Sequence, residues 1–220
     1  MHTSPHLLDP LLSRQSVGAL EDPAPQGADL DLILEAGLRA PDHGRLRPWR
    51  FVLIRGDARM ALSDCLAAAG RDRQAPQAQI DRIRAWPLRT PLLIGVGAQI
   101  RPGHSIPEIE QMLSAGAAAM NMLNAIHMLG YAGMWVTGAN TYDPKVNAAL
   151  GFQAPSRLVG FLAVGTAKAP SPGAAGPAAR PDRHAHVIDW SGPLNGKAAA
   201  QARRARTPHC PVAPVRPMHS

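Results

Sequence analysis

The sequence predicts a layered domain of the α+β or α/β class, in which helices cover a sheet whose central strands are buried. Two continuous apolar runs, residues 91–98 and 157–165, are typical of strands that are buried on both faces. Around them, apolar residues recur with a 3.6-residue period, most clearly over residues 29–39. Strands interleaved with helices in this way indicate layers packed around one core.

Turn and cap signals divide the first ninety residues into five elements. Pro41 stops one helix, and Asp57 is a candidate cap for the helix that follows the first strand. In order, we expect a helix that carries Leu7, Leu8, Leu11 and Leu12 on one face and ends near Arg14, a helix over residues 29–39, a strand over residues 50–55, a helix from Asp57 to Gly70, and a polar helix over residues 75–86.

The second half of the body contains the longest helix. Pro107 lies near its start and Gly130 just past its end, which are the positions that these residue types favour. In order, we expect a strand over residues 91–98, the long helix over 107–129, a short strand over 134–136, a short helix capped by Asp143 and ending at Leu150, and a strand over 157–165.

The long helix carries six small residues in a row, from Ser114 to Ala119. Small side chains let another backbone approach closely, so this stretch indicates a central helix packed on all sides, within the domain or across a dimer axis. The simpler alternative is that alanine favours helix formation.

Composition excludes several classes of protein. The chain has 220 residues, of which 45% are hydrophobic, enough for one generous domain or a domain plus a tail. It lacks an uninterrupted apolar run of about 18 residues, which argues against a membrane span, and its start does not resemble a secretory signal. Two cysteines do not make a disulfide framework or a four-thiolate zinc site, so we expect a cytoplasmic protein.

The positive charge is concentrated at the C-terminus. Residues 1–190 hold 18 Lys and Arg against 16 Asp and Glu, whereas residues 191–220 hold five basic residues and no acid. Residues 169–181 are rich in Pro, Ala and Gly, which indicates a loop or linker, and a short apolar patch follows at residues 186–190. We therefore expect a domain over residues 1–190 and a disordered basic tail over 191–220. Because the domain is nearly neutral, nucleic acid is an unlikely partner.

Familiar catalytic motifs are absent. The chain has no P-loop, no GxSxG elbow and no complete Rossmann glycine pattern. His184 and His186 lie in a Pro- and Ala-rich segment without partner ligands, so no metal site is expected.

Three separated segments carry a chemical signal instead. In Ser13-Arg14-Gln15-Ser16, an arginine two residues before a hydroxyl is suited to hold an anion. Residues 39–50 form a proline-bracketed loop with four arginines, a histidine and an aspartate, and Trp49 leads from it into a strand. In residues 131–138, two glycines would let a planar ligand lie on the backbone.

In this order and spacing, the three segments resemble the flavin-dependent nitroreductase family, and in particular its small single-domain branch. The strings that carry the resemblance are SRQS, AGLRAPDHGRLRPWRFVLI, SAGAAAMNMLNAIHMLGYAGMWVTG and LVGFLAVGT, and it covers residues 7–168. The resemblance implies an α+β fold with a mixed sheet flanked by helices, an intertwined homodimer, and FMN bound at the dimer interface.

The resemblance also implies a set of site residues, matched one by one. Arg14, Gln15 and Ser16 match the family's Arg-Arg-Ser, which holds the FMN phosphate and ribityl region, with Gln15 in place of the second arginine. The other FMN-binding positions are Arg39 and His43, which reach the flavin held mainly by the other subunit, and Trp135, Val136 and Thr137 beside the flavin ring, where the family more often has Arg and Ser after the Trp. The stretch matched to NAD(P) binding is Ala125, Ile126, His127, Met128, Leu129 and Gly130.

The implied activity is that of an FMN-dependent NAD(P)H oxidoreductase. FMN would carry the hydride chemistry, so no side chain needs to act as nucleophile or general base. NAD(P)H would reduce FMN and leave, and a nitroaromatic or quinone-like acceptor would then take the electrons in a ping-pong cycle. Arg14 is the candidate cation that stabilises the reduced flavin. Two alternatives remain: a flavoprotein of the same fold with a non-nitro substrate, and a basic interaction protein that acts through its tail.

Overall fold

The computed structural model describes residues 5–169, 181–182, 186–187 and 190. The chain divides into one unit over Met1–Pro172 and a second over Gly173–Ser220, and the helices and strands described below all lie in the first. The tail predicted over residues 191–220 lies outside the described residues, so the predicted boundary at residue 190 stays a prediction. Within the described ranges, no helix is long and apolar enough to cross a membrane.

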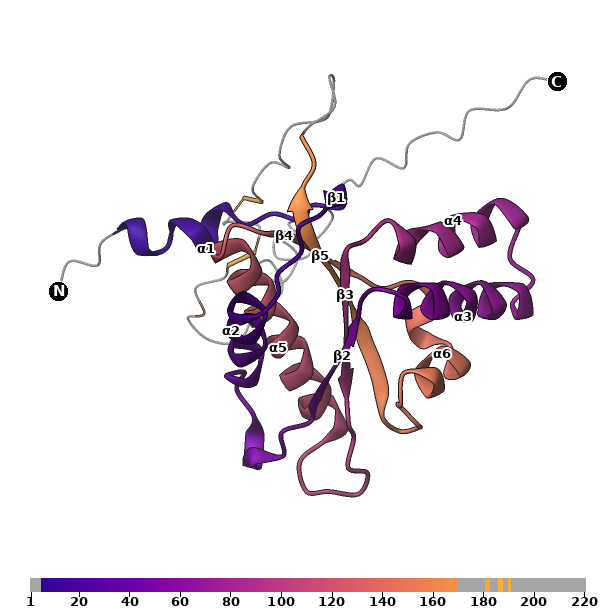
Figure 1. Ribbon diagram of the computed structural model, residues 1–220. Helices are drawn as coiled ribbons and strands as arrows, with labels where there is room; N and C mark the ends of the chain where they lie inside the picture. The colour runs from indigo at the N-terminus through magenta and orange to yellow at the C-terminus, as the bar shows by residue number, and fades with distance from the viewer. Residues whose placement is uncertain (1–4, 170–180, 183–185, 188–189, 191–220) are drawn as a thin grey trace, which may run out of the picture. The chain divides into compact units, whose positions relative to one another are not determined.

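A five-stranded sheet forms the centre of the first unit (Figure 1). Its main path runs β1 (Leu20–Glu21), β5 (Arg157–Ala167), β3 (Leu92–Ala98) and β2 (Trp49–Ile54), and β4 (Ala132–Val136) also pairs with β5. Whereas a mixed sheet is expected, each pairing between the described strands is antiparallel.

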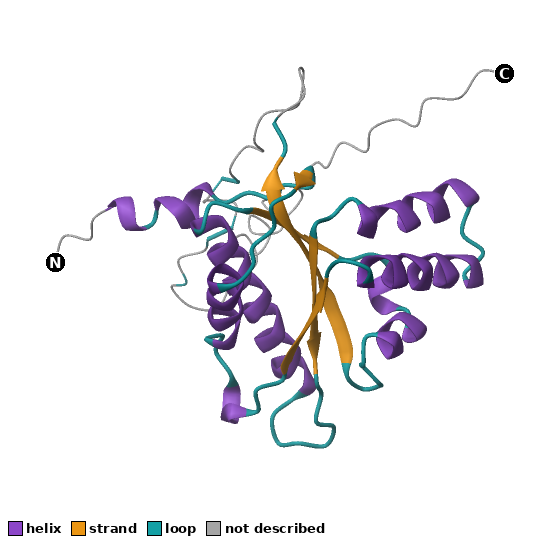
Figure 2. Cartoon of the chain, in the orientation of Figure 1, coloured by secondary structure: helices purple, strands orange, loops and turns teal. Residues whose placement is uncertain are grey.

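Helices cover both faces of this sheet, which confirms the α+β class (Figure 2). One layer holds α2 (Ala28–Leu38) and the long α5 (Glu108–Met128); the opposite layer holds α3 (Ala58–Asp72), α4 (Gln77–Leu88) and α6 (Pro144–Ala149). Ile94 and Leu162 pack in the core under α2 and α5, and their strand neighbours Leu93 and Phe161 pack in the core on the other side. Because side chains alternate between the faces of a strand, burial of both faces explains the continuous apolar runs.

Most of the predicted elements are confirmed within one to three residues of their expected ends, with three differences. Asp57 occupies the position before α3 but makes no side-chain cap bond, because its backbone is already helical. The two-residue β1 was not predicted, since such a short strand has no periodicity to detect. The predicted first helix is a 3-10 turn at Pro5–Leu7 followed by α1 (Asp9–Ser13).

The long helix α5 is not packed on all sides within the described part of the chain. Ser114, Ala115, Ala118 and Ala119 are buried, as a close-packed small-residue stretch requires. On another face of the same helix, however, Ile109 and Leu113 are 63% and 64% exposed, and Met120 and Met128 are also exposed. The four leucines of the N-terminal helical segment are exposed as well. These apolar surfaces belong to the helices that flank the predicted cofactor segments.

Candidate functional site

The N-terminal segment meets β4 at the edge of the sheet. The backbone N–H of Val17 donates to the carbonyl oxygen of Gly133, at an N···O distance of 3.1 Å. This contact places residues 14–16 beside the strand that carries Trp135 and Val136. A cavity of about 190 Å³ lies at the same place, lined by residues that include Arg14, Gln15, His127, Gly130 and Tyr131. Two of the segments singled out in the sequence therefore form one site.

Arg14 contributes an unsatisfied cation to this site. Its Nη1 atom is buried and has no hydrogen-bond partner among the described residues. A guanidinium stays charged and offers only donors, so leaving one of its nitrogens buried and unpaired is unfavourable. Placed beside a cavity, such a group favours binding of an anion that accepts hydrogen bonds, and a phosphate oxygen meets that need.

Gln15 and Ser16 lie next to Arg14 and are both exposed. Gln15 lines the cavity, whereas Ser16 does not. The neighbouring Ser13 shares a hydrogen bond with His127, with Oγ and Nε2 3.0 Å apart, and this bond ties the N-terminal segment to the end of α5.

The indole of Trp135 is partly buried against the core on the α2 and α5 side and does not line the cavity. A Cβ atom added at Gly160 would lie 2.1 Å from its Nε1, and one added at Gly116 would lie 3.7 Å from its Cη2. The indole therefore lies over the backbone of Gly160 on β5, where only glycine leaves room. Its Nε1 is buried without a hydrogen-bond partner in the described part of the chain.

Val136 is the last residue of β4, and Thr137 follows it. Val136 packs on the core of the α3 and α6 side, whereas Trp135 packs on the α2 and α5 side. Thr137, just beyond the strand, is exposed.

The stretch predicted to bind NAD(P) forms the end of α5 and its cap. Ile126 is buried, and the N–H of Tyr131 donates to its carbonyl oxygen across Gly130, whose φ of 85° suits glycine. His127 and Gly130 are the members of this stretch that line the cavity. The helix cap accounts for the geometry, and the NAD(P) role of residues 125–130 stays a prediction.

Tyr131, which the sequence did not single out as a functional side chain, also lines the cavity. Its hydroxyl donates to Asp29 Oδ2 at 2.8 Å. The hydrogen bond to this carboxylate raises the pKa of Tyr131 from its ordinary value, because it stabilises the protonated phenol.

His43 lies at the opposite end of α5 from Arg14. His43 Nδ1 is 2.6 Å from Glu110 Oε2 near the start of the helix, whereas Ser13 contacts His127 near its end. The helix has 21 residues and therefore spans about 30 Å. One protomer therefore does not bring Arg14 and His43 into a single site. Arg39 is exposed just after α2.

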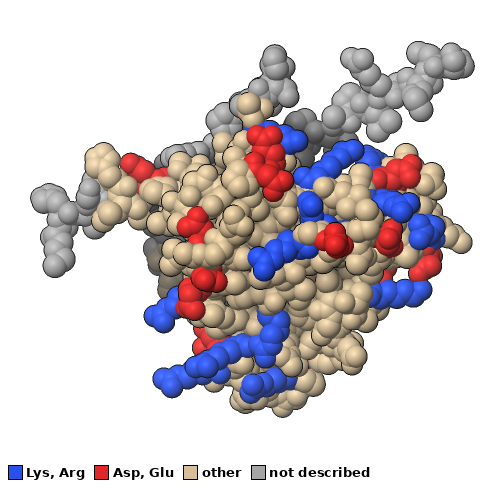
Figure 3. All heavy atoms as spheres, viewed as in Figure 1, with Lys and Arg blue, Asp and Glu red and all other residues tan. Residues whose placement is uncertain are grey.

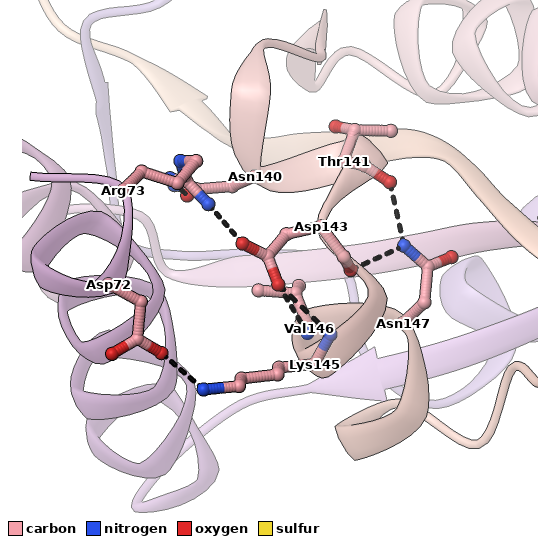
Figure 4. A network of polar contacts seen from close by, with 8 residues as sticks. All are labelled: Asp72, Arg73, Asn140, Thr141, Asp143, Lys145, Val146 and Asn147. Atoms are coloured by element: carbon pink, nitrogen blue, oxygen red, sulfur yellow. Dashed lines mark hydrogen bonds and ion pairs between the residues drawn. The ribbon is translucent and has the colours of Figure 1, made fainter.

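The loop after β4 is held by a polar network that the sequence did not reveal (Figure 4). Arg73, at the end of α3, donates to both Asp143 and Asn140, and Lys145 Nζ lies 2.5 Å from Asp72 Oδ2. Asp143 also accepts from the N–H of Lys145 and so caps α6, as predicted. The network fixes the chain that follows Thr137. A larger cavity, of about 530 Å³, lies beside α6 and contains none of the predicted site residues.

Comparison with protein families matches residues 11–166 to the family described as "Nitroreductase family". The chain is 42% identical over 163 residues to a protein of Escherichia coli K12 named "Putative NAD(P)H nitroreductase YdjA"; the match covers 72% of this chain and 87% of that protein.

Solved structures share the fold. The nitroreductase-like family protein from Bacillus cereus superposes with a TM-score of 0.73 at 23% identity, over 87% of this chain and all of that one. A Desulfovibrio desulfuricans protein crystallised in complex with FMN superposes with a TM-score of 0.63 at 25% identity, again over 87% of this chain and 100% of that one.

Proposed function

The chain belongs to the nitroreductase family, and from this premise we propose that it is an FMN-dependent oxidoreductase that takes electrons from NAD(P)H and passes them to nitroaromatic or quinone-like acceptors. Its relative in E. coli carries the name of an NAD(P)H nitroreductase, and a relative from D. desulfuricans was crystallised with FMN. Both relatives match most of the chain, and the family match over residues 11–166 includes the segments that form the candidate site.

The observation that carries the proposal is that Nη1 of Arg14, beside a cavity, is buried and has no partner in the part of the chain that the structure describes. A phosphate group would supply the missing acceptor and the opposite charge at once. Gly130 and Gly133 line the same cavity, where a ligand would approach the backbone closely. These residues fit the phosphate end of FMN, while β4 offers its edge and the Thr137 hydroxyl to the ring.

A homodimer completes the site in this proposal. The exposed Ile109, Leu113 and Met120 lie on one face of α5 at helical spacing and form an apolar stripe that a second copy would cover. A two-fold axis perpendicular to α5 and near its middle would set the two copies of α5 antiparallel, because such an axis reverses the helix direction. The start of one α5, with His43, then lies beside the end of the other, with Arg14.

The chain's own residues would bind and orient rather than take part in covalent chemistry. FMN, when bound, supplies hydride transfer between NAD(P)H and the acceptor in a ping-pong cycle. Arg14 holds the anionic end, and a cation close to the flavin also favours the reduced, negatively charged form. The backbone of β4 would support the ring, and the stripe, once covered, would exclude water from one side of the site.

The test is the absorption spectrum and cofactor content of the purified full-length chain. We expect yellow protein that contains FMN, runs as a dimer in sedimentation, and oxidises NADH or NADPH in the presence of a quinone or a nitroaromatic compound. Colourless dimeric protein that fails to take up added FMN would refute the flavoenzyme assignment. FMN-loaded protein that oxidises NAD(P)H but reduces neither acceptor class would favour a same-fold flavoprotein with another substrate.

The basic C-terminus favours a second candidate, an interaction protein that acts through its tail. Residues 191–220 carry five basic residues and no acid, whereas acidic and basic side chains are interspersed over the face of the body seen in Figure 3. Deleting residues 191–220 separates the candidates. We expect unchanged FMN content and NAD(P)H oxidation in the truncated protein. Loss of flavin on truncation would show that the tail belongs to the site.

A further inference from the structure

Within the described ranges, the side chain of His43 makes one close polar contact, and that contact is with an acid far away in the sequence. Its Nδ1 lies 2.6 Å from Oε2 of Glu110. His43 stands on the short 3-10 turn His43–Arg45, and Glu110 lies in the first turn of α5. The two side chains are 66% and 42% exposed, so the imidazole presents its remaining edge outward.

The contact determines which ring nitrogen carries the proton. A carboxylate has only acceptor sites, so the hydrogen bond at Nδ1 requires an N–H there. In the neutral ring the other nitrogen, Nε2, then has a free lone pair, and in the charged ring it is a second donor. The carboxylate also fixes the rotation of the ring, because its oxygen accepts at one nitrogen and not at the other.

The backbone around His43 is held independently of Glu110. Ser114, one turn further along α5 on the same face, donates from Oγ to the carbonyl oxygen of Pro41 at 2.8 Å. Gly44 has a φ of 68°, and a Cβ atom there would lie 2.3 Å from Cδ1 of Ile106. The backbone is thus held on both sides of His43 without Glu110. What Glu110 contributes is the orientation and the tautomer of the imidazole ring.

We propose that Glu110 is a positioning residue, which sets the tautomer and orientation of His43 so that Nε2 is the nitrogen offered to the flavin held by the second copy. The place of the flavin rests on the proposed function, whereas the tautomer does not. Ser114 and Gly44 position the loop; Glu110 positions the ring.

The direct test is the tautomer of His43, read from its side-chain ¹⁵N chemical shifts in the full-length protein at about pH 8.5, where an ordinary imidazole is neutral. Replacing His43 with glutamine assigns its signals among the nine histidines of the chain. We expect the Nδ1–H form in the wild type, retention of that form in Glu110→Gln, whose amide oxygen still accepts, and a mixture dominated by Nε2–H in Glu110→Ala. Glu108→Ala removes the same charge from the same helical turn, has no contact with His43, and should leave the shifts unchanged. An unchanged tautomer in Glu110→Ala overturns the proposal.

The affinity for FMN is a second readout of the contact between His43 and Glu110. We expect Glu110→Ala to weaken FMN binding about two- to fivefold, the range of a partly exposed ion pair, and Glu110→Gln to restore most of the affinity. In a His43→Ala background, Glu110→Ala should have no further effect, because its influence passes through the ring. An equal loss in both backgrounds would make Glu110 a general structural residue. If no variant binds FMN, the proposed function fails, while the tautomer measurement still decides the role of Glu110.

Discussion

Replacing Arg14 with alanine is expected to change two properties in opposite directions. The guanidinium has a buried nitrogen without a partner among the described residues. In the FMN-loaded protein, that nitrogen would make a charge-assisted hydrogen bond to phosphate; in the cofactor-free protein, it is a desolvated and unpaired donor. The variant should therefore bind FMN more weakly, and without FMN it should be no less stable than the wild type.

The size of each change follows from the contact that is lost. A hydrogen bond to a charged group contributes about 1.5–3 kcal/mol, which corresponds to a loss of roughly ten- to hundredfold in FMN affinity. Removing a buried, unsatisfied donor raises the free energy of unfolding of the cofactor-free protein by about 1–3 kcal/mol. In a domain of this size, each 1 kcal/mol moves the thermal midpoint by about 2–4 °C, and loss of the arginine stem's packing offsets part of that gain.

Two measurements on the same samples test this reasoning. Quenching of flavin fluorescence gives the FMN affinity, and calorimetry of the cofactor-free protein gives the thermal midpoint. Arg89→Ala is the matched control, because Arg89 is exposed after α4 and its side chain makes no hydrogen bond or ion pair within the described structure. Wild-type FMN affinity in Arg14→Ala would remove Arg14 from the site. A drop of several degrees in the midpoint of the cofactor-free protein would contradict the expected gain from removing a buried, unsatisfied donor.

Three further substitutions test the surroundings of the site. Gly160→Ala should destabilise the protein by about 1–3 kcal/mol in chemical denaturation, because its Cβ would collide with the indole of Trp135; a change below 0.5 kcal/mol would contradict that packing. Asp143→Ala should lower the free energy of unfolding by about 1–2 kcal/mol, because the α6 cap and the contact with α3 disappear, and Asp143→Asn should lie between it and the wild type. Equal stability of all three proteins would refute the cap. Asp29 raises the pKa of Tyr131, so the stabilisation from this bond is complete below the pKa of the unfolded state, near 10, and is lost as pH rises through the higher pKa of the folded state. Tyr131→Phe should therefore reduce the loss of unfolding free energy at alkaline pH. An unchanged pH dependence of the unfolding free energy would contradict this role.

The fold was largely predictable because its signals are local. The runs at residues 91–98 and 157–165 are apolar throughout since both faces of β3 and β5 are buried, and the caps around α5 and α6 lie where their sequence signals place them. The missing cap bond at Asp57 shows the limit of such signals. Residue type alone does not determine whether the residue before a helix has the extended backbone that lets its side chain reach back.

The site was predictable only in part, because its geometry depends on contacts between distant residues. The sequence singled out Arg14 and His43, but not that α5 separates them by most of its length. It did not reveal that Glu110 contacts His43, since the two are 67 positions apart in the sequence. It also gave no sign that the indole of Trp135 lies over Gly160, which follows from the register of β4 against β5.

We propose that each FMN site takes Arg14 from one copy and Arg39 and His43 from the other. The most direct test is a mixed dimer, purified with two different affinity tags, in which one subunit carries Arg14→Ala and the other carries Arg39→Ala and His43→Ala. Across a shared site, one of the two sites would then combine all three wild-type residues. We predict one FMN per mixed dimer bound with wild-type affinity, although both parent homodimers bind FMN weakly. A mixed dimer in which neither site binds FMN tightly would contradict the account, because each site would then be built within a single subunit.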